Sequence, residues 1–146
     1  MKVLVACEYS GIVRDAFIAK GHTATSCDIL PTKAPGPHLQ GDISEVDVSQ
    51  YDLMIAHPPC TRLCSSGARW WDKYPGECED AINFFMWFVR APVKRKAIEN
   101  PVGRMSKVYR RPNQIVQPWY SNRTRPRDMT FPGMAAAMAE QWGTLE

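Results

Sequence analysis

The chain has 146 residues and a formal net charge of +3, with 45% hydrophobic and 23% charged residues. This length predicts a single domain over residues 1–146 with one core, and the composition excludes wholesale disorder. The longest apolar stretch, residues 81–89, is too short to span a bilayer, and the first residues lack a signal-peptide pattern. We therefore expect a cytoplasmic protein with no membrane partner. The five cysteines show no disulfide-framework spacing and are expected to be reduced thiols.

The positive charge is concentrated in one segment. Residues 90–127 contain eleven Lys and Arg residues against a single acid, Glu99, whereas the segments on either side are acidic. Such a block is typical of a surface that binds a polyanion, although a solvated basic face is the alternative. The adjacent tryptophans Trp70 and Trp71 are candidates for burial or for stacking on bases.

The elements alternate between strands and helices along the chain. Apolar and β-branched runs predict strands at 2–6, 23–29, 52–56 and 96–99, with a short strand or turn at 39–43. Residue spacing and composition predict helices at 12–20, 77–90 and 132–142, the first ending at Gly21. Prolines and glycines predict loops at 31–37 and 61–76, and the polar segment 103–128 has no assignment. This alternation is typical of an open α/β sheet of the doubly wound type.

Ligands of such sheets bind where the strands end at their carboxyl side. Cys60 follows a predicted strand and two prolines, which favours a nucleophile held in a fixed direction, the alternative being a small buried hydrophobe. Glu99 ends another strand, where a buried carboxyl group could donate a proton, the alternative being a salt bridge to a nearby arginine.

The segment after the first strand, C-E-Y-S-G at residues 7–11, is suited to a nucleotide-like cofactor near the start of a helix. It lacks the G-x-G-x-x-G spacing of a dinucleotide site. Asp28, at the end of the second strand, could accept hydrogen bonds from a ribose diol or could serve as a turn residue.

Several of these motifs occur together in one family. The quoted segments are P-P-C at 58–60, E-N-P-V at 99–102, C-E-Y-S-G at 7–11, C-T-R-L-C-S-S-G at 60–67 and T-F-P-G-M-A-A at 130–136. In these segments the chain resembles the cytosine carbon-5 DNA methyltransferases, most closely their short phage-encoded relatives that lack a target-recognition domain. The resemblance implies a three-layer, Rossmann-like methyltransferase fold with a mostly parallel sheet, shortened here at its C-terminal strands.

The resemblance also implies a chemistry and a set of site residues. Cys60 would attack carbon 6 of cytosine, Glu99 would stabilise the intermediate at ring nitrogen 3, and Asn100 would help to hold Glu99. The methyl donor would be S-adenosylmethionine, and a base in duplex DNA would have to flip out to reach Cys60. The implied cofactor residues are Cys7, Glu8, Tyr9, Ser10, Gly11, Asp28, Ile29, Asp42, Ile43 and Pro58. The implied nucleic-acid residues are Arg62, Ser65, Ser66, Arg69, Arg123 and Arg125.

Two other functions remain open from the sequence. Residues 103–129 are too few for the arginine motif and further strands that the family carries there, which favours a catalytically inactive binding protein, a homodimer, or a subunit that needs a partner. A zinc site from His57, Cys60, Cys64 and Cys78 is the third possibility, but its spacing fits no standard zinc pattern, so we predict no metal.

Overall fold

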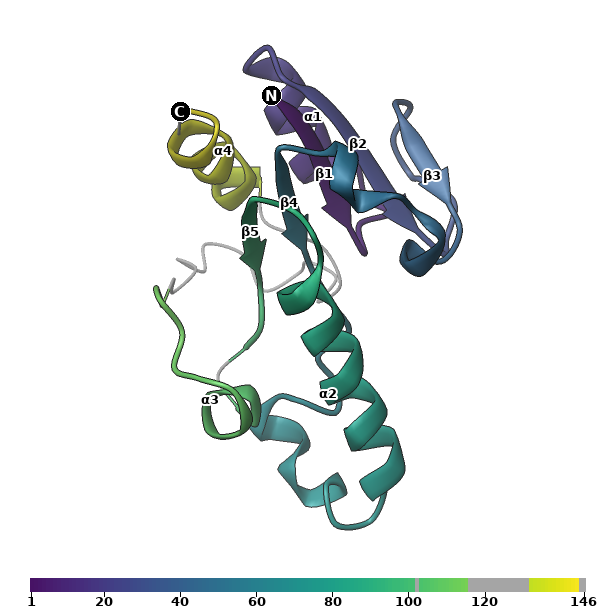
Figure 1. The fold of residues 1–146 in the computed structure, drawn as a ribbon, viewed down its shortest axis with the longest axis vertical. Helices are drawn as coiled ribbons and strands as arrows, with labels where there is room; N and C mark the ends of the chain where they lie inside the picture. Colours follow the sequence, from purple (N-terminus) through teal and green to yellow (C-terminus); the bar gives the residue numbers. More distant parts are fainter. Residues whose placement is uncertain (102, 116–131, 145–146) are drawn as a thin grey trace.

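The fold is built on one parallel β-sheet (Figure 1). A computed structural model describes residues 1–101, 103–115 and 132–144. The strands follow the order β3-β2-β1-β4-β5, and every neighbouring pair is parallel. They are β1 (Lys2–Ala6), β2 (Thr23–Asp28), β3 (His38–Gln40), β4 (Leu53–Ala56) and β5 (Arg95–Ile98). The four strands predicted from the sequence are thus confirmed to within one residue at each end.

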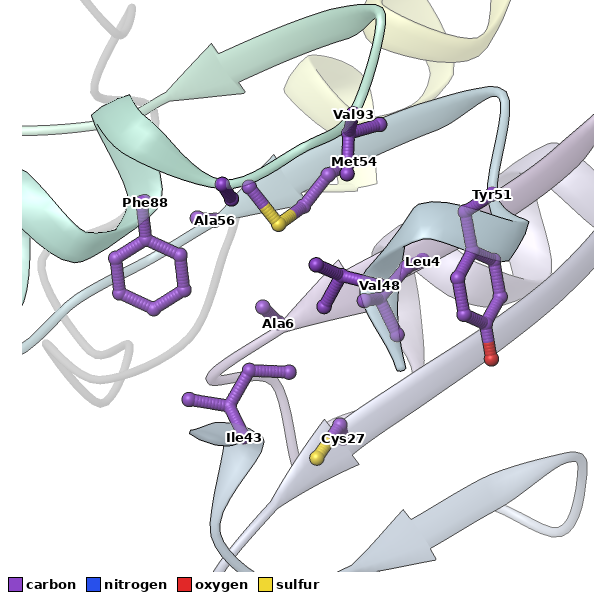
Figure 2. Close-up of a cluster of buried hydrophobic side chains, with 11 residues drawn as sticks. Leu4, Ala6, Cys27, Ile43, Val48, Tyr51, Met54, Ala56, Phe88 and Val93 are labelled. Atoms are coloured by element: carbon purple, nitrogen blue, oxygen red, sulfur yellow. The ribbon is translucent and has the colours of Figure 1, made fainter. Parts of the chain in front are cut away.

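The central strands bury side chains on both faces. Along β1, Val3 and Val5 point to one core cluster, whereas Leu4 and Ala6 point to the other. Figure 2 shows Leu4 and Ala6 in the second cluster, where Met54 of β4 and Phe88 also lie. Because every second side chain of a strand faces the same side, a continuous apolar run is expected only where both faces are covered. The unbroken run at residues 3–6 therefore marks β1 as an interior strand.

Helices supply that cover. On the Val3 face, α1 (Ile12–Ala19) and α4 (Pro132–Trp142) pack against each other and against the sheet. On the Leu4 face lie the C-terminal part of α2 (Pro75–Arg90) and two 3-10 turns, η1 (Ile43–Glu45) and η2 (Val48–Gln50). The helices predicted at 12–20 and 132–142 are confirmed. Helix α2 begins two residues earlier than predicted, because Pro75 fits the first helical position.

The connection from β2 to β3 contains no helix. Parallel strands are ordinarily joined through a crossover of a dozen or more residues, but here residues 29–37 make the crossing alone. Arg14 of α1, whose side chain is fully buried, holds this loop. Its guanidinium donates hydrogen bonds to Thr32 Oγ1 and to the carbonyl oxygens of Ala34 and Pro35 at 3.1–3.3 Å. Gly36 lies against the guanidinium so closely that a Cβ there would meet it at 2.7 Å.

A second, smaller assembly extends beyond the sheet at the lower end of Figure 1. The N-terminal half of α2, the 3-10 helix η3 (Ser65–Trp70) and the short helix α3 (Met105–Val108) form it. Leu63, Phe85 and Met105 are its buried centre. The prediction of an uninterrupted loop at 61–76 was wrong, because the small residues of S-S-G-A permit a tight turn. The N–H of Gly67 donates to Cys64 O at 3.1 Å, and a Cβ at Gly67 would meet Thr61 O at 2.5 Å.

The structure is therefore an α/β protein with a five-stranded, all-parallel sheet flanked by helices, an arrangement compatible with a Rossmann-like fold. Residues 103–115 and 132–144 add no strand beyond β5. Within the described residues, none of the helices has the length and apolar character needed to cross a membrane.

Candidate active site

All five strands end at one edge of the sheet, because they are parallel. The residues that follow them there are Cys7 to Gly11 after β1, Asp28 at the end of β2, Asp42 after β3, His57 to Cys60 after β4, and Glu99 with Asn100 after β5. In an open parallel sheet this edge is where ligands bind.

Cys60 and Glu99 come from neighbouring strands. Ala56 pairs with Ile98 in the β4–β5 ladder, and the Glu99 N–H extends that ladder by donating to Ala56 O at 2.9 Å. Beyond β4 the chain turns sharply, since the N–H groups of Leu63 and Cys64 both donate to Cys60 O, at 2.8 and 2.9 Å. Cys60 is thereby held at the first turn after the strand, with its side chain half-buried.

The charge of Glu99 affects the acidity of the Cys60 thiol. Burial raises the pKa of the Cys60 thiol above its ordinary value, and the negative charge of Glu99 raises it further, ahead of a smaller effect from Cys64. Glu99 is exposed rather than buried as expected, but the protein atoms around its carboxyl still raise the pKa of that group. The free protein therefore keeps Cys60 as a protonated thiol at neutral pH, beside a carboxyl group that accepts a proton more readily than usual.

His57 and Asn100 present polar atoms that are buried and without a hydrogen bond among the described residues: Nε2 of His57 and Oδ1 of Asn100. Burial lowers the pKa of His57 to about 4, so its imidazole is neutral at physiological pH. The Asn100 amide donates to Pro101 O at 2.9 Å. In the part of the chain that the structure describes, no hydrogen bond joins Asn100 to Glu99, and the Asn100 amide group contacts the following residue instead.

Glu8 has a structural task at this edge. Its carboxylate is buried and accepts hydrogen bonds from the N–H groups of Val13 at 2.7 Å and Arg14 at 3.2 Å, and from Ser10 Oγ at 3.0 Å. The Ile12 N–H in turn donates to Ser10 Oγ at 3.3 Å. The N-terminal N–H groups of α1 are thus already satisfied, and a carboxylate occupies the position that a phosphate takes in dinucleotide-binding proteins. Direct cofactor contacts by Glu8 and Ser10 stay predictions.

Acidic side chains surround Cys7. Burial raises the pKa of Cys7 to about 12, and the charges of Asp28, Cys27 and Asp42 add to this effect. The backbone of Cys7 is left-handed, with φ 56°, and Gly11 follows with φ 78°. Asp28 Oδ1 accepts the Leu30 N–H at 2.9 Å. The structure therefore brings the ends of β1, β2 and β3 together around two carboxylates.

Asp42 uses one oxygen locally: Oδ1 accepts from both the N–H and the hydroxyl of Ser44 at 2.8 Å, which lowers its pKa. The remaining oxygens of Asp28 and Asp42 have no hydrogen bond from the described residues.

The other expected cofactor residues differ in exposure. Ile29 is 71% exposed, whereas the Ile43 side chain is buried in the core and offers only its backbone to a ligand. Tyr9 lies under the Lys33 ammonium, 4.5 Å from its ring centre, and Pro58 is buried.

The residues assigned to nucleic acid fall into three groups. Arg62 donates to Glu77 at 2.9 Å and lies over the Tyr74 ring, so its charge is largely neutralised. Ser65, Ser66 and Arg69 are exposed on η3. Arg123 and Arg125 lie outside the described residues. Sequence reasoning missed Arg104, which lies over the Trp71 ring at 5.1 Å; its position within the basic block was the available signal.

The zinc arrangement is not formed. Cys78 is completely buried in α2, and among the described residues no three His, Cys, Asp or Glu side chains converge in a way that could hold a metal ion. All five cysteines are free thiols.

Comparisons with known proteins assign the chain to no family. No protein-family model matches the chain. Searches of curated proteins and of solved structures likewise find no match.

Proposed function

We propose that this protein is an S-adenosylmethionine-dependent methyltransferase that acts on carbon 5 of cytosine, in DNA or in a nucleotide. The observation that carries the proposal is the pairing of Cys60 with Glu99 after adjacent strands, close enough for the carboxylate to raise the pKa of the thiol. A sulfur nucleophile beside a proton-holding carboxyl group is the combination that addition to a pyrimidine ring requires.

The proton balance of the first step follows from the two pKa shifts. Cys60 loses its proton to Glu99 as its sulfur attacks carbon 6 of the base, and Glu99 passes that proton to ring nitrogen 3, so carbon 5 becomes an enamine-like nucleophile. When bound, S-adenosylmethionine supplies the methyl group that carbon 5 accepts. Water takes the carbon-5 proton, and the Cys60 thiolate departs as the aromatic base is restored. The proton on ring nitrogen 3 returns through Glu99 to Cys60, which regenerates the thiol.

The residues around Cys7 fit such a cofactor better than one that carries a pyrophosphate. Glu8 fills the N-terminus of α1, which a pyrophosphate would need. Asp28 and Asp42 each retain a carboxylate oxygen able to accept from ribose hydroxyls or an adenine amine. Ile29 presents an exposed apolar surface next to Asp28. With free thiols throughout, a cytoplasmic location is part of the proposal.

The test is transfer of a labelled methyl group to DNA and to cytosine nucleotides by the purified protein. Cys60→Ala should abolish transfer, whereas Cys64→Ala, which removes a thiol from the same turn, should retain it. DNA that contains 5-fluorocytosine should remain covalently attached to the wild type, because fluorine at carbon 5 cannot leave as a proton. Transfer that survives Cys60→Ala would exclude the proposed nucleophile.

The second candidate is a binding protein of the same fold without catalytic turnover. It is favoured by the resting state of Cys60, a thiol whose pKa is raised rather than lowered. It is also favoured by β5, which has only β4 as a neighbour in the described residues, an edge that a partner subunit or second copy could extend. Calorimetry with S-adenosylmethionine separates the candidates, since cofactor binding without methyl transfer to any cytosine substrate would select the second.

A further inference from the structure

The assembly beyond the sheet carries an unbalanced positive charge. We define the basic arm as residues 61–74 and 103–111, which include η3 and α3 (Figure 1). The arm contains seven Lys and Arg residues and one acid, Asp72. The N-terminal half of α2 adds three acids, Glu77, Glu79 and Asp80, of which Glu77 is paired with Arg62, so the assembly keeps an excess of three positive charges. The stretch from residue 103 to 111 contributes four of the cations and no acid: Arg104, Lys107, Arg110 and Arg111.

The two halves of the arm are joined by their backbones. Cys64 and Gly103 form an isolated antiparallel bridge, and the Arg104 N–H donates to Leu63 O at 2.8 Å. The approach is so close that a Cβ at Gly103 would lie 2.2 Å from Leu63 O. Cations distant in the sequence, at 69–73 and at 104–111, therefore belong to one small, backbone-coupled surface.

Aromatic rings alternate with these cations. Arg69 and Lys73 lie over the Trp70 ring at 4.9 and 5.2 Å, and Arg110 lies over Tyr109 at 5.3 Å. Arg104 covers Trp71, whose indole N–H is buried without an acceptor among the described residues. Cation–ring contacts at exposed sites are weak, so a phosphate can draw the cation away and leave the ring face to a base. Positive groups that follow a backbone, together with aromatic faces for stacking, are what single-stranded nucleic acids require.

We infer that the basic arm binds a single-stranded polynucleotide, its cations contacting phosphates and its rings stacking on unpaired bases. The arm begins at the residue after Cys60, so it is joined directly to the segment that follows β4. The inference deepens the proposed function and rests on it for the destination of the bound base. The binding itself requires neither cofactor nor catalysis.

A matched pair of double variants tests the inference. Lys107→Gln with Arg111→Gln removes two exposed charges from the arm, and Arg90→Gln with Lys94→Gln removes two exposed charges near the start of β5. In the described residues, none of these four side chains forms a hydrogen bond or ion pair, so both double variants should fold, as circular dichroism would check. Binding is measured by fluorescence anisotropy with a labelled single strand of about 20 nucleotides, as DNA and as RNA, and with the DNA duplex.

The wild type should bind at least one of the single strands more tightly than the duplex. The arm pair should reduce the slope of log K against log salt by about 1.4, which corresponds to about 25-fold weaker binding at 0.1 M salt, whereas the control pair should change affinity by less than about twofold. Equal losses in both pairs would show that net charge alone is responsible and would overturn the inference, as would tighter binding of the duplex.

Stacking is tested separately at Trp70. Trp70→Leu should weaken single-strand binding by about tenfold, and Trp70→Phe should restore most of it. The assay is run without cofactor and in the Cys60→Ala background. Strand binding by a wild type that transfers no methyl group in the labelled-methyl assay with cofactor would reject the proposed function and leave the inference standing. Methyl transfer unaffected by the arm pair would reject the inference alone.

Discussion

The buried carboxylate of Glu8 caps the first turn of α1 by accepting a hydrogen bond from the N–H of Val13 at 2.7 Å. The Arg14 N–H and the Ser10 hydroxyl donate to the same carboxylate. The carboxylate is thus the acceptor for helix N–H groups that water or a ligand would otherwise satisfy, and its loss would leave these buried donors without a hydrogen bond.

We expect Glu8→Ala to lower the free energy of unfolding by about 2–4 kcal/mol, because two backbone N–H groups would lose a charged acceptor. Urea unfolding followed by circular dichroism measures the change. Glu45→Ala removes an exposed carboxylate and should shift stability by less than about 0.5 kcal/mol. Equal effects of the two substitutions would contradict the capping role.

His57 should make stability depend on pH. Burial lowers its pKa to about 4 in the folded protein, whereas in the unfolded chain it titrates near 6.5. Between these values the unfolded chain binds more protons, so stability falls as pH decreases, by about 2 kcal/mol from pH 7 to pH 5. The difference between wild type and His57→Gln, measured by urea unfolding at several pH values, isolates this contribution. Parallel curves for the two proteins would refute it.

The link between Glu99 and Cys60 can be read from thiol reactivity. The carboxylate of Glu99 raises the pKa of Cys60, so Glu99→Gln should increase the fraction of Cys60 present as thiolate. The rate of alkylation by iodoacetamide at pH 8 should then rise about tenfold for each unit by which the pKa of Cys60 falls, which corresponds to about 1.4 kcal/mol. Mass spectrometry of the peptide that contains Cys60 separates it from the other four thiols. Glu79→Gln, an exposed position on α2, should leave the rate unchanged.

Gly103 should tolerate no side chain. A Cβ there would meet Leu63 O at 2.2 Å and Cys64 Cα at 2.9 Å, so Gly103→Ala should separate the bridge and destabilise the protein by about 2 kcal/mol or more. Gly76 is the matched control, because it lies in the first turn of α2, where a Cβ would meet no atom within 4 Å. Gly76→Ala should be neutral or stabilising by up to about 1 kcal/mol. Differential scanning calorimetry compares them.

The sheet was predictable from the sequence because its signal is local. Unbroken apolar runs such as residues 3–6 and 53–56 identify buried parallel strands, and Gly21 ends α1 in a left-handed conformation (φ 85°) as expected. The gathering of the site residues was also predictable, since parallel strands place their carboxyl ends at one edge of the sheet and the residues that follow them lie there. This placed Cys60 and Glu99 at one edge before any contact was known.

The rest depends on contacts between distant segments. The sequence shows a carboxylate at residue 8 but not whether it caps a helix or faces a ligand. The need for glycine at residue 103 becomes visible only when the Leu63 carbonyl is seen to lie against it. Arg14 was missed because a charged residue in a helix ordinarily faces solvent. Its place one helical turn before Phe17, on the buried side of α1, was the signal.

Arg14 also bears on how firmly β3 is attached. The strand is held by its pairing with β2 and by the loop before it, and that loop is fixed by the buried arginine of α1. A three-residue strand at the edge adds little of its own to resist opening. We therefore expect β3 to open first, so that its amides exchange with deuterium well before those of β1 and β4.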